Sequence, residues 1–133
     1  MNENIEKVVR TCIELINAEN PNLKVNYNKT GFIFTNIAGY NILGIHGEVS
    51  DLETALKDYS QVYGVQIDYI VAGHTHHTSF KNIGVRKGVI SVGSIVGSDD
   101  FSIKIRKTAD ATASFVIFEE GKGKVCEHTI VLN

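Results

Sequence analysis

The stretch Ile42-Leu43-Gly44-Ile45-His46-Gly47-Glu48, followed by Asp68-Tyr69-Ile70-Val71-Ala72-Gly73-His74-Thr75-His76, decides the fold of this chain. Each part is a stretch of mainly apolar residues followed directly by a histidine that has a glycine next to it. If a helix joins them, the two runs form a βαβ unit whose strands lie parallel. Both strands then end at the same edge of the sheet, where ligands bind in open α/β sheets.

The segment between the two runs carries clear helix signals. Ser50 and Glu53 have the spacing of a capping box, and Asp51 falls in the first turn, where the helix dipole favours an anion. Gly64 stands where a left-handed C-terminal cap is expected. The buried face is expected to consist of Leu52, Ala55, Leu56, Tyr59, Val62 and Tyr63.

The histidines at these strand ends carry the chemistry. The topology brings His46, His74 and His76 to one place, and residues i and i+2 of an extended segment point to the same side. Imidazole is a good ligand for zinc, iron, manganese and nickel, and a neighbouring glycine lets an ion approach the backbone. A lone strand-end histidine is more often an ordinary surface residue, and we keep that interpretation for His77 and His128.

The rest of the chain predicts one more helix and several strands. A helix with an apolar face is expected from about residue 5 to Asn20-Pro21, and 24–28 with 31–36 could form a hairpin. Further strands are expected at 89–92, 102–106, 113–119 and 125–132, the last two joined by a turn at Gly121-Lys122-Gly123. The apolar face of the helix is expected to comprise Ile5, Val8, Val9, Cys12, Ile13 and Ile16.

Composition bounds the class of protein. With 133 residues, 43% of them hydrophobic, the chain suits a single globular domain spanning 1–133. A net charge of −2 requires neither nucleic acid nor an anionic membrane as partner. The two distant cysteines, Cys12 and Cys126, fit reduced thiols of a cytoplasmic protein. No apolar run approaches the roughly 20 residues that span a bilayer, so no membrane partner is expected.

The two histidine motifs resemble the last two motifs of the calcineurin-like metallophosphoesterases, and Ser91-Val92-Gly93-Ser94-Ile95-Val96-Gly97 is similar to a stretch that follows them there. Bacterial and prophage phosphoesterases or DNA exonucleases are the most similar members. The resemblance covers residue 40 to the end. It implies an α/β fold with α+β tendency: the C-terminal half of a four-layer α/β/β/α sandwich, with mixed sheets and two main helices.

The resemblance also implies roles for the histidines. His46 and His74 match ligands of the second metal of a dinuclear centre, and His76 matches a ligand of the first. The metals would be divalent manganese, iron or zinc, and the substrate a phosphate ester, with nucleic acid left open. The family's earlier Asp-x-His, Gly-Asp and Gly-Asn-His motifs are missing before His46. We therefore expect a truncated piece, a split gene or a decayed gene, with little activity alone.

Three hypotheses of function stay open. The first is the C-terminal portion of a metal-dependent phosphoesterase, and the second is a non-catalytic module of the same fold that binds a metal or a partner. The third is a mononuclear three-histidine metal site with hydrolytic chemistry of its own. Because the missing half would cover sheet edges and an apolar face, we also expect a homo-oligomer through the exposed sheet.

Overall fold

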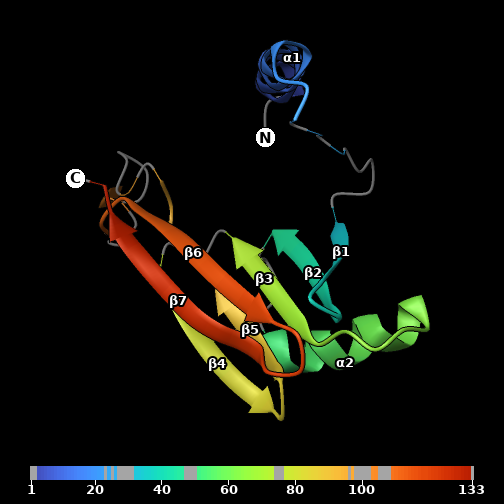
Figure 1. Ribbon diagram of the computed structural model, residues 1–133. Coiled ribbons are helices and arrows are strands. Elements are labelled where there is room, and N and C mark those ends of the chain that lie inside the picture. Colours follow the sequence, from blue (N-terminus) through green and yellow to red (C-terminus); the bar gives the residue numbers. More distant parts are fainter. Residues whose placement is uncertain are drawn as a thin grey trace.

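A computed structural model describes residues 3–22, 24, 26, 32–46, 51–73, 77–95, 97, 103–104 and 109–132. Its elements are α1 (Glu3–Glu19), β1 (Ile33–Ile37), β2 (Tyr40–His46), α2 (Leu52–Tyr63), β3 (Tyr69–Gly73), β4 (Ser79–Gly84), β5 (Lys87–Ser91), β6 (Thr112–Glu119) and β7 (Gly123–Val131). Figure 1 shows the seven strands in two sheets, with α2 against the larger one. The predicted mixed sheets and two main helices are confirmed.

The larger sheet has the strand order β1-β2-β3-β5-β4. Its three central strands, β2, β3 and β5, are parallel to one another, while β1 and β4 pair antiparallel at the two edges. The predicted βαβ unit is therefore present as β2-α2-β3. The smaller sheet is the antiparallel hairpin β6-β7, and its tight turn lies at residues 120–122, as the glycine pattern predicts.

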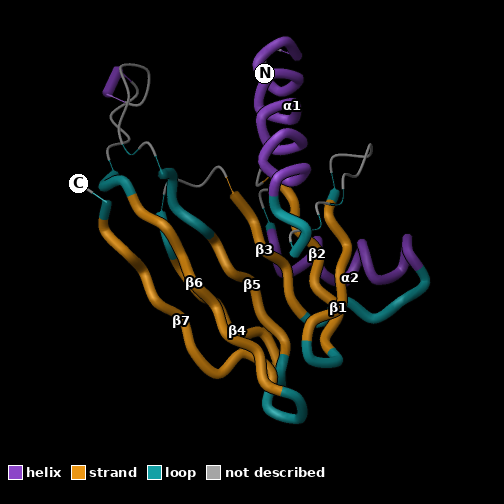
Figure 2. Tube along the Cα trace, turned by 45° about the horizontal axis from the view of Figure 1, so that its top comes forward, coloured by secondary structure: helices purple, strands orange, loops and turns teal. Residues whose placement is uncertain are grey.

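The central strands of the larger sheet are buried on both faces. One cluster, centred on the fully buried Leu43, Ile67 and Ile70, packs against Ala55 and Leu56 of α2. A second cluster of Ile42, Tyr69 and Ile90 faces the hairpin sheet and packs against Val116 and Phe118 of β6. The central strands are continuous apolar runs for this reason, since strands covered on both faces need no polar alternation. Figures 1 and 2 show the hairpin lying across the central strands.

A polar clamp fixes how β2 lies against β3. The Asp68 carboxylate accepts a hydrogen bond from the backbone N–H of Asn41 at 2.9 Å, and the Asp68 N–H donates to the Asn41 carbonyl at 2.9 Å. The Asn41 side chain also donates to the carbonyl of Gln66 at 2.8 Å. These bonds join the beginnings of the two strands and so hold the parallel register along their length.

Helix α2 begins and ends with caps, although its N-cap differs from the prediction. The N-cap is Asp51, whose carboxylate accepts from the backbone N–H groups of Glu53 and Thr54, and Gly64 closes the helix in the left-handed conformation at φ 64°. Ser50 lies outside the described residues. The predicted buried face is right for Ala55 and Leu56 but wrong at its end, where Val62 is 77% exposed. The larger sheet does not reach far enough to cover that last turn.

Two features of the strand prediction were wrong. β4 was missed because Ser79–Gly84 is an exposed edge strand without an apolar alternation. Ile103 and Lys104, predicted as strand, are helical. β1 pairs with β2 through a two-residue turn at Ala38 and Gly39, both with positive φ, which is the turn that two-residue hairpins favour. The other half of the predicted hairpin, residues 24–28, lies largely outside the described residues.

Helix α1 forms where predicted, but its apolar face is not buried. Val8, Val9 and Ile16 are more than half exposed, and Cys12 is exposed as well. Figure 1 shows α1 set apart from both sheets. Both cysteines are free thiols, as predicted. Neither helix, over the residues described, is long and apolar enough to cross a membrane.

The burial pattern predicts how the core responds to truncation. Ile70→Ala should destabilise the protein by about 2–5 kcal/mol, because this side chain of β3 is fully buried in the cluster that packs against α2 and its loss leaves a cavity. The matched control is Ile95→Ala, at a position 71% exposed, which should change stability by less than about 1 kcal/mol. Urea unfolding followed by circular dichroism measures both. Equal losses would contradict this placement of the core.

Candidate functional site

Three parallel strands end together at one edge of the larger sheet, which we call the carboxyl edge. His46, the last residue of β2, pairs in register with Gly73, the last residue of β3. On the other side of β3, Ala72 pairs with Ser91, the last residue of β5, and the Val92 N–H donates to the Ala72 carbonyl at 2.9 Å. The backbone therefore brings His46 and Gly73, the residue that precedes His74 in the sequence, side by side at this edge.

Only one of the three predicted metal ligands can be described in detail. His46 is exposed at the end of β2. His74 and His76 directly follow Gly73 in the sequence, but they lie outside the described residues. A Cβ atom added at Gly73 would meet no atom of the described residues within 4 Å, so none of these residues fills the space beside the strand end. An exposed imidazole beside such a space is compatible with a metal ion.

The other candidate residues behave as the sequence suggests where they can be seen. His77 and His128 are exposed, as predicted for surface residues. Within the part of the chain that is described, no three His, Cys, Asp or Glu side chains gather as metal ligands.

A group of small polar residues completes the carboxyl edge, and sequence reasoning missed it. The Thr78 hydroxyl accepts from the Gly93 N–H at 3.2 Å, and the Thr112 N–H donates to the Ser94 carbonyl at 2.9 Å. A side chain at Gly93 would collide with the Thr112 hydroxyl, so only glycine fits where the two sheets meet. The available signal was the motif Ser91-Val92-Gly93-Ser94, whose glycine permits this approach.

Two open pockets of about 440 Å³ each lie on the molecule, at opposite ends of the central strands. One is at the carboxyl edge, where His77 and Thr78 face Thr112 and Thr129 of the hairpin sheet. The other lies near Gly64, at the C-terminal end of α2, where β3 begins rather than ends. Only the first adjoins the histidine motifs, so only the first is relevant to chemistry there.

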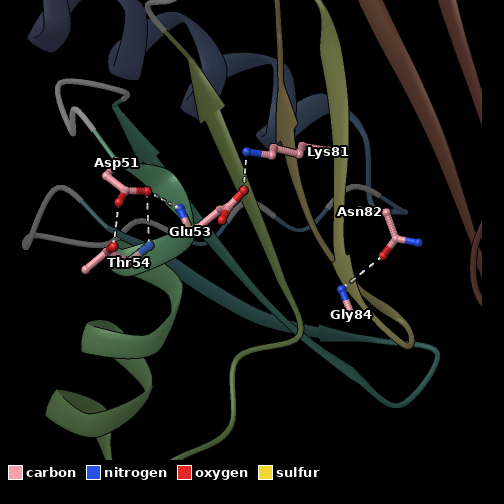
Figure 3. A network of polar contacts seen from close by, with 6 residues as sticks. All are labelled: Asp51, Glu53, Thr54, Lys81, Asn82 and Gly84. Carbon is pink, nitrogen blue, oxygen red and sulfur yellow. Dashed lines mark hydrogen bonds and ion pairs between the residues drawn. The ribbon is translucent and has the colours of Figure 1, made fainter.

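The beginning of α2 adds fixed charges near the carboxyl edge, because α2 follows β2 after residues 47–51. Figure 3 shows Asp51 capping the helix while Glu53 forms an ion pair with Lys81 of β4. The hydrogen bond from the Thr54 hydroxyl, at 2.5 Å, lowers the pKa of the Asp51 carboxyl. The hydrogen bond to Glu53 raises the pKa of Lys81. The cap and the ion pair join the beginning of α2 to its own backbone and to β4.

Comparison with known proteins identifies the fold. No family model matches the chain. It is 27% identical over 136 residues to an SPbeta prophage-derived uncharacterized protein, YonJ, of Bacillus subtilis (strain 168), covering 98% of this chain and 34% of that protein. An archaeal phosphodiesterase superimposes with a TM-score of 0.54 at 20% identity, covering 90% of this chain and 59% of that one. Vps29 from Entamoeba histolytica, solved as a zinc complex, superimposes with a TM-score of 0.54 at 19% identity. The match covers 84% of this chain and 68% of the Vps29 chain.

The chain has the calcineurin-like metallophosphoesterase fold. The expected resemblance is thus confirmed at the level of the fold, and the prophage-derived relative agrees with the expected prophage type. The chain spans about a third of that relative and 59% of the archaeal phosphodiesterase.

The cap of α2 predicts a pH effect on stability. The pKa of the Asp51 carboxyl is lower in the folded state than in the unfolded state, where it is about 3.9. The charged carboxylate therefore stabilises the fold at pH values above the unfolded-state pKa. This contribution disappears as the pH falls through the lower pKa of the folded state. The Asp51→Asn substitution keeps a hydrogen-bond acceptor but removes the charge. The free energy of unfolding of this variant should therefore change less between about pH 5 and about pH 2 than that of wild type. Urea unfolding measures this, with Asp58→Asn on the same helix as control. Parallel pH profiles for wild type and Asp51→Asn would contradict it.

Proposed function

We propose that this chain carries the histidine half of a metal-dependent phosphoesterase site, with His46, His74 and His76 as ligands. The observation that supports this most directly is the register that pairs His46 with Gly73, the residue before His74. Adjacent strands lie about 4.8 Å apart, which is short enough for imidazoles from two strand ends to meet one ion or two neighbouring ions. The zinc complex of the structurally similar Vps29 supports a divalent metal.

The residues of this chain would do three things at such a site. His46 would bind the metal from the end of β2. His74 and His76, which follow β3 in the sequence, would bind it from the end of the neighbouring strand. The bound metal would polarise the phosphoryl group and lower the pKa of a bound water. The rigid ends of β2 and β3 would keep the ligands in position, because both strands are held by the buried core and by the Asp68 clamp.

This half is expected to have little activity alone. No aspartate and no histidine precedes His46 in the sequence, so the carboxylate that bridges two metals in the resembled family has no counterpart there. The chain also spans only part of its relatives. We infer that a separate polypeptide segment would have to supply the remaining ligands. The alternative is a non-catalytic module that keeps the metal or only the fold.

Metal analysis tests this proposal. The full chain purified without chelator, or reloaded with manganese or zinc, should bind at least one ion, and His46→Ala and His74→Ala should each weaken binding at least tenfold because each removes a ligand. His128→Ala is the matched control, since His128 is exposed on β7, and it should bind metal like wild type. Titration calorimetry and elemental analysis give the affinities and the stoichiometry.

The same preparations test the expected inactivity. With manganese, the chain should hydrolyse bis-p-nitrophenyl phosphate no faster than buffer. Turnover that disappears in His74→Ala would show that the chain alone is an active enzyme. One tightly bound zinc per chain with hydrolytic activity would support a mononuclear three-histidine site. Metal binding unaffected by His46→Ala and His74→Ala would refute the proposed site.

We further propose that the chain self-associates through the β1 edge of the larger sheet. Among the described strands β1 lies at one edge of the larger sheet, paired with β2 on one side, and every residue of it is exposed. Three of its five residues are large and apolar: Ile33, Phe34 and Ile37. An exposed apolar edge strand is a template for pairing with another chain.

Light scattering with size-exclusion chromatography tests the association. The wild-type chain should run as a dimer or larger species at micromolar concentration, and Ile33→Lys should shift it toward monomer by charging the edge. Val85→Lys, in the exposed turn between β4 and β5, is the control and should leave the oligomer intact. A monodisperse wild-type monomer would refute this proposal.

A further inference from the structure

The pocket at the carboxyl edge lies between the two sheets and is lined mainly by polar groups. Its polar lining comes from His77 and Thr78 after β3, from Asp110 and Thr112 before and at the start of β6, and from Thr129 of β7. The volume of about 440 Å³ is within the range of small-molecule sites. The pocket begins one residue beyond His76 in the sequence, so a ligand in it would lie beside the histidine edge.

The polarity of this pocket follows from a change along β6. Phe118 and Val116 face the larger sheet and pack on its apolar cluster. Further toward the carboxyl edge the same face of β6 carries Ser114 and Thr112, which approach Thr78. The space between the sheets is thus sealed by apolar side chains at one end and lined by hydroxyls at the end where β2, β3 and β5 terminate.

The hydroxyl groups of the pocket keep hydrogen-bonding capacity for a ligand. Thr78 Oγ1 lies 3.5 Å from Thr112 Oγ1 and 3.5 Å from Ser114 Oγ, which is beyond the 2.5–3.0 Å range of good hydroxyl hydrogen bonds. Its closer contact, at 3.2 Å, accepts the Gly93 N–H. The Thr78 hydroxyl can therefore still donate, and the hydroxyl of Thr112 can donate or accept.

The charge of the lining selects among ligands. Asp110 is the acidic group there, and no lysine or arginine is among the described residues that line the pocket. With no basic side chain among these described lining residues, the Asp110 carboxylate repels a phosphate and accepts hydrogen bonds from hydroxyl donors. Threonine hydroxyls with one carboxylate and one imidazole suit vicinal hydroxyls of a neutral sugar. An apolar group would leave these polar atoms unpaired.

We propose that this pocket binds the sugar portion of a phosphate ester, so that the complete site acts on sugar phosphates or on the sugar end of a nucleotide. The inference rests on the proposed function, because it assigns the phosphate to the histidine edge and the neutral hydroxyl-bearing group to the neighbouring pocket. Thr112 and Asp110 are specificity-determining residues in this arrangement.

The probe that tests this is methyl β-D-ribofuranoside, which carries hydroxyls and no phosphate, titrated into the ¹⁵N-labelled full chain with chelator present. We expect millimolar binding, with amide shifts concentrated at Thr78, Thr112 and Thr129. Thr112→Val removes one hydroxyl at nearly constant shape and should weaken binding roughly threefold to tenfold. Asp110→Asn should weaken it similarly. Thr35→Val, on exposed β1, is the matched control and should bind like wild type.

Each result decides the matter. Absent shifts, shifts elsewhere, or equal binding by Thr112→Val, Asp110→Asn and wild type would overturn the sugar pocket. Saturation of these same amides by inorganic phosphate alone would also overturn it, since the pocket would then be an anion site. If Thr112→Val does not fold, Asp110→Asn carries the test. Because the glycoside titration needs no metal, its failure is distinct from failure of the histidine site, which metal analysis reports.

Discussion

The parallel pairing of β2 with β3 is the constraint on which the rest of the structure depends. In this register His46, the last residue of β2, pairs with Gly73, the last residue of β3, at one edge of the sheet. A slip by one residue would turn every side chain of a strand to the opposite face and exchange the two apolar clusters. The Asp68 carboxylate opposes such a slip, because it binds the Asn41 N–H at the other end of the strands. The position of His46 relative to Gly73 is therefore fixed by a hydrogen bond about five residues earlier in each strand.

The two faces of the larger sheet contribute differently to the site. The face toward α2 supplies the cluster that makes the strand ends rigid. The face toward the hairpin sheet is apolar around Tyr69 and hydroxyl-lined around Thr78 and Thr112, so the same pair of sheets provides both a core and a polar pocket. Gly93 allows the sheets to approach at the boundary. The space between the two sheets is therefore closed by apolar side chains at one end and lined by polar groups at its open end, and such a site suits a polar ligand.

The uncovered surfaces agree with a chain that spans part of a longer fold. β1 is an exposed edge, and the apolar face of α1 is exposed as well. The metallophosphoesterase-like structures to which the chain is similar extend well beyond the part matched here. Apolar surface of this kind is stabilised by burial, whether against another copy or against a further polypeptide segment. Both proposals for partners follow from this one property.

Much of this protein was determined by its sequence alone. The apolar runs ending at His46 and before His74, with a helix between them, sufficed to predict a βαβ unit and a shared strand edge, because the handedness and direction of such units leave few alternatives. The hairpin turn near Gly121 was equally local. Features that depend on contacts between residues distant in the sequence were decided only by the tertiary structure. The edge strand β4 has no apolar pattern, and its pairing with β5 defines it. The pocket of threonines is assembled from residues more than 30 positions apart, and local sequence carries no signal for such an encounter.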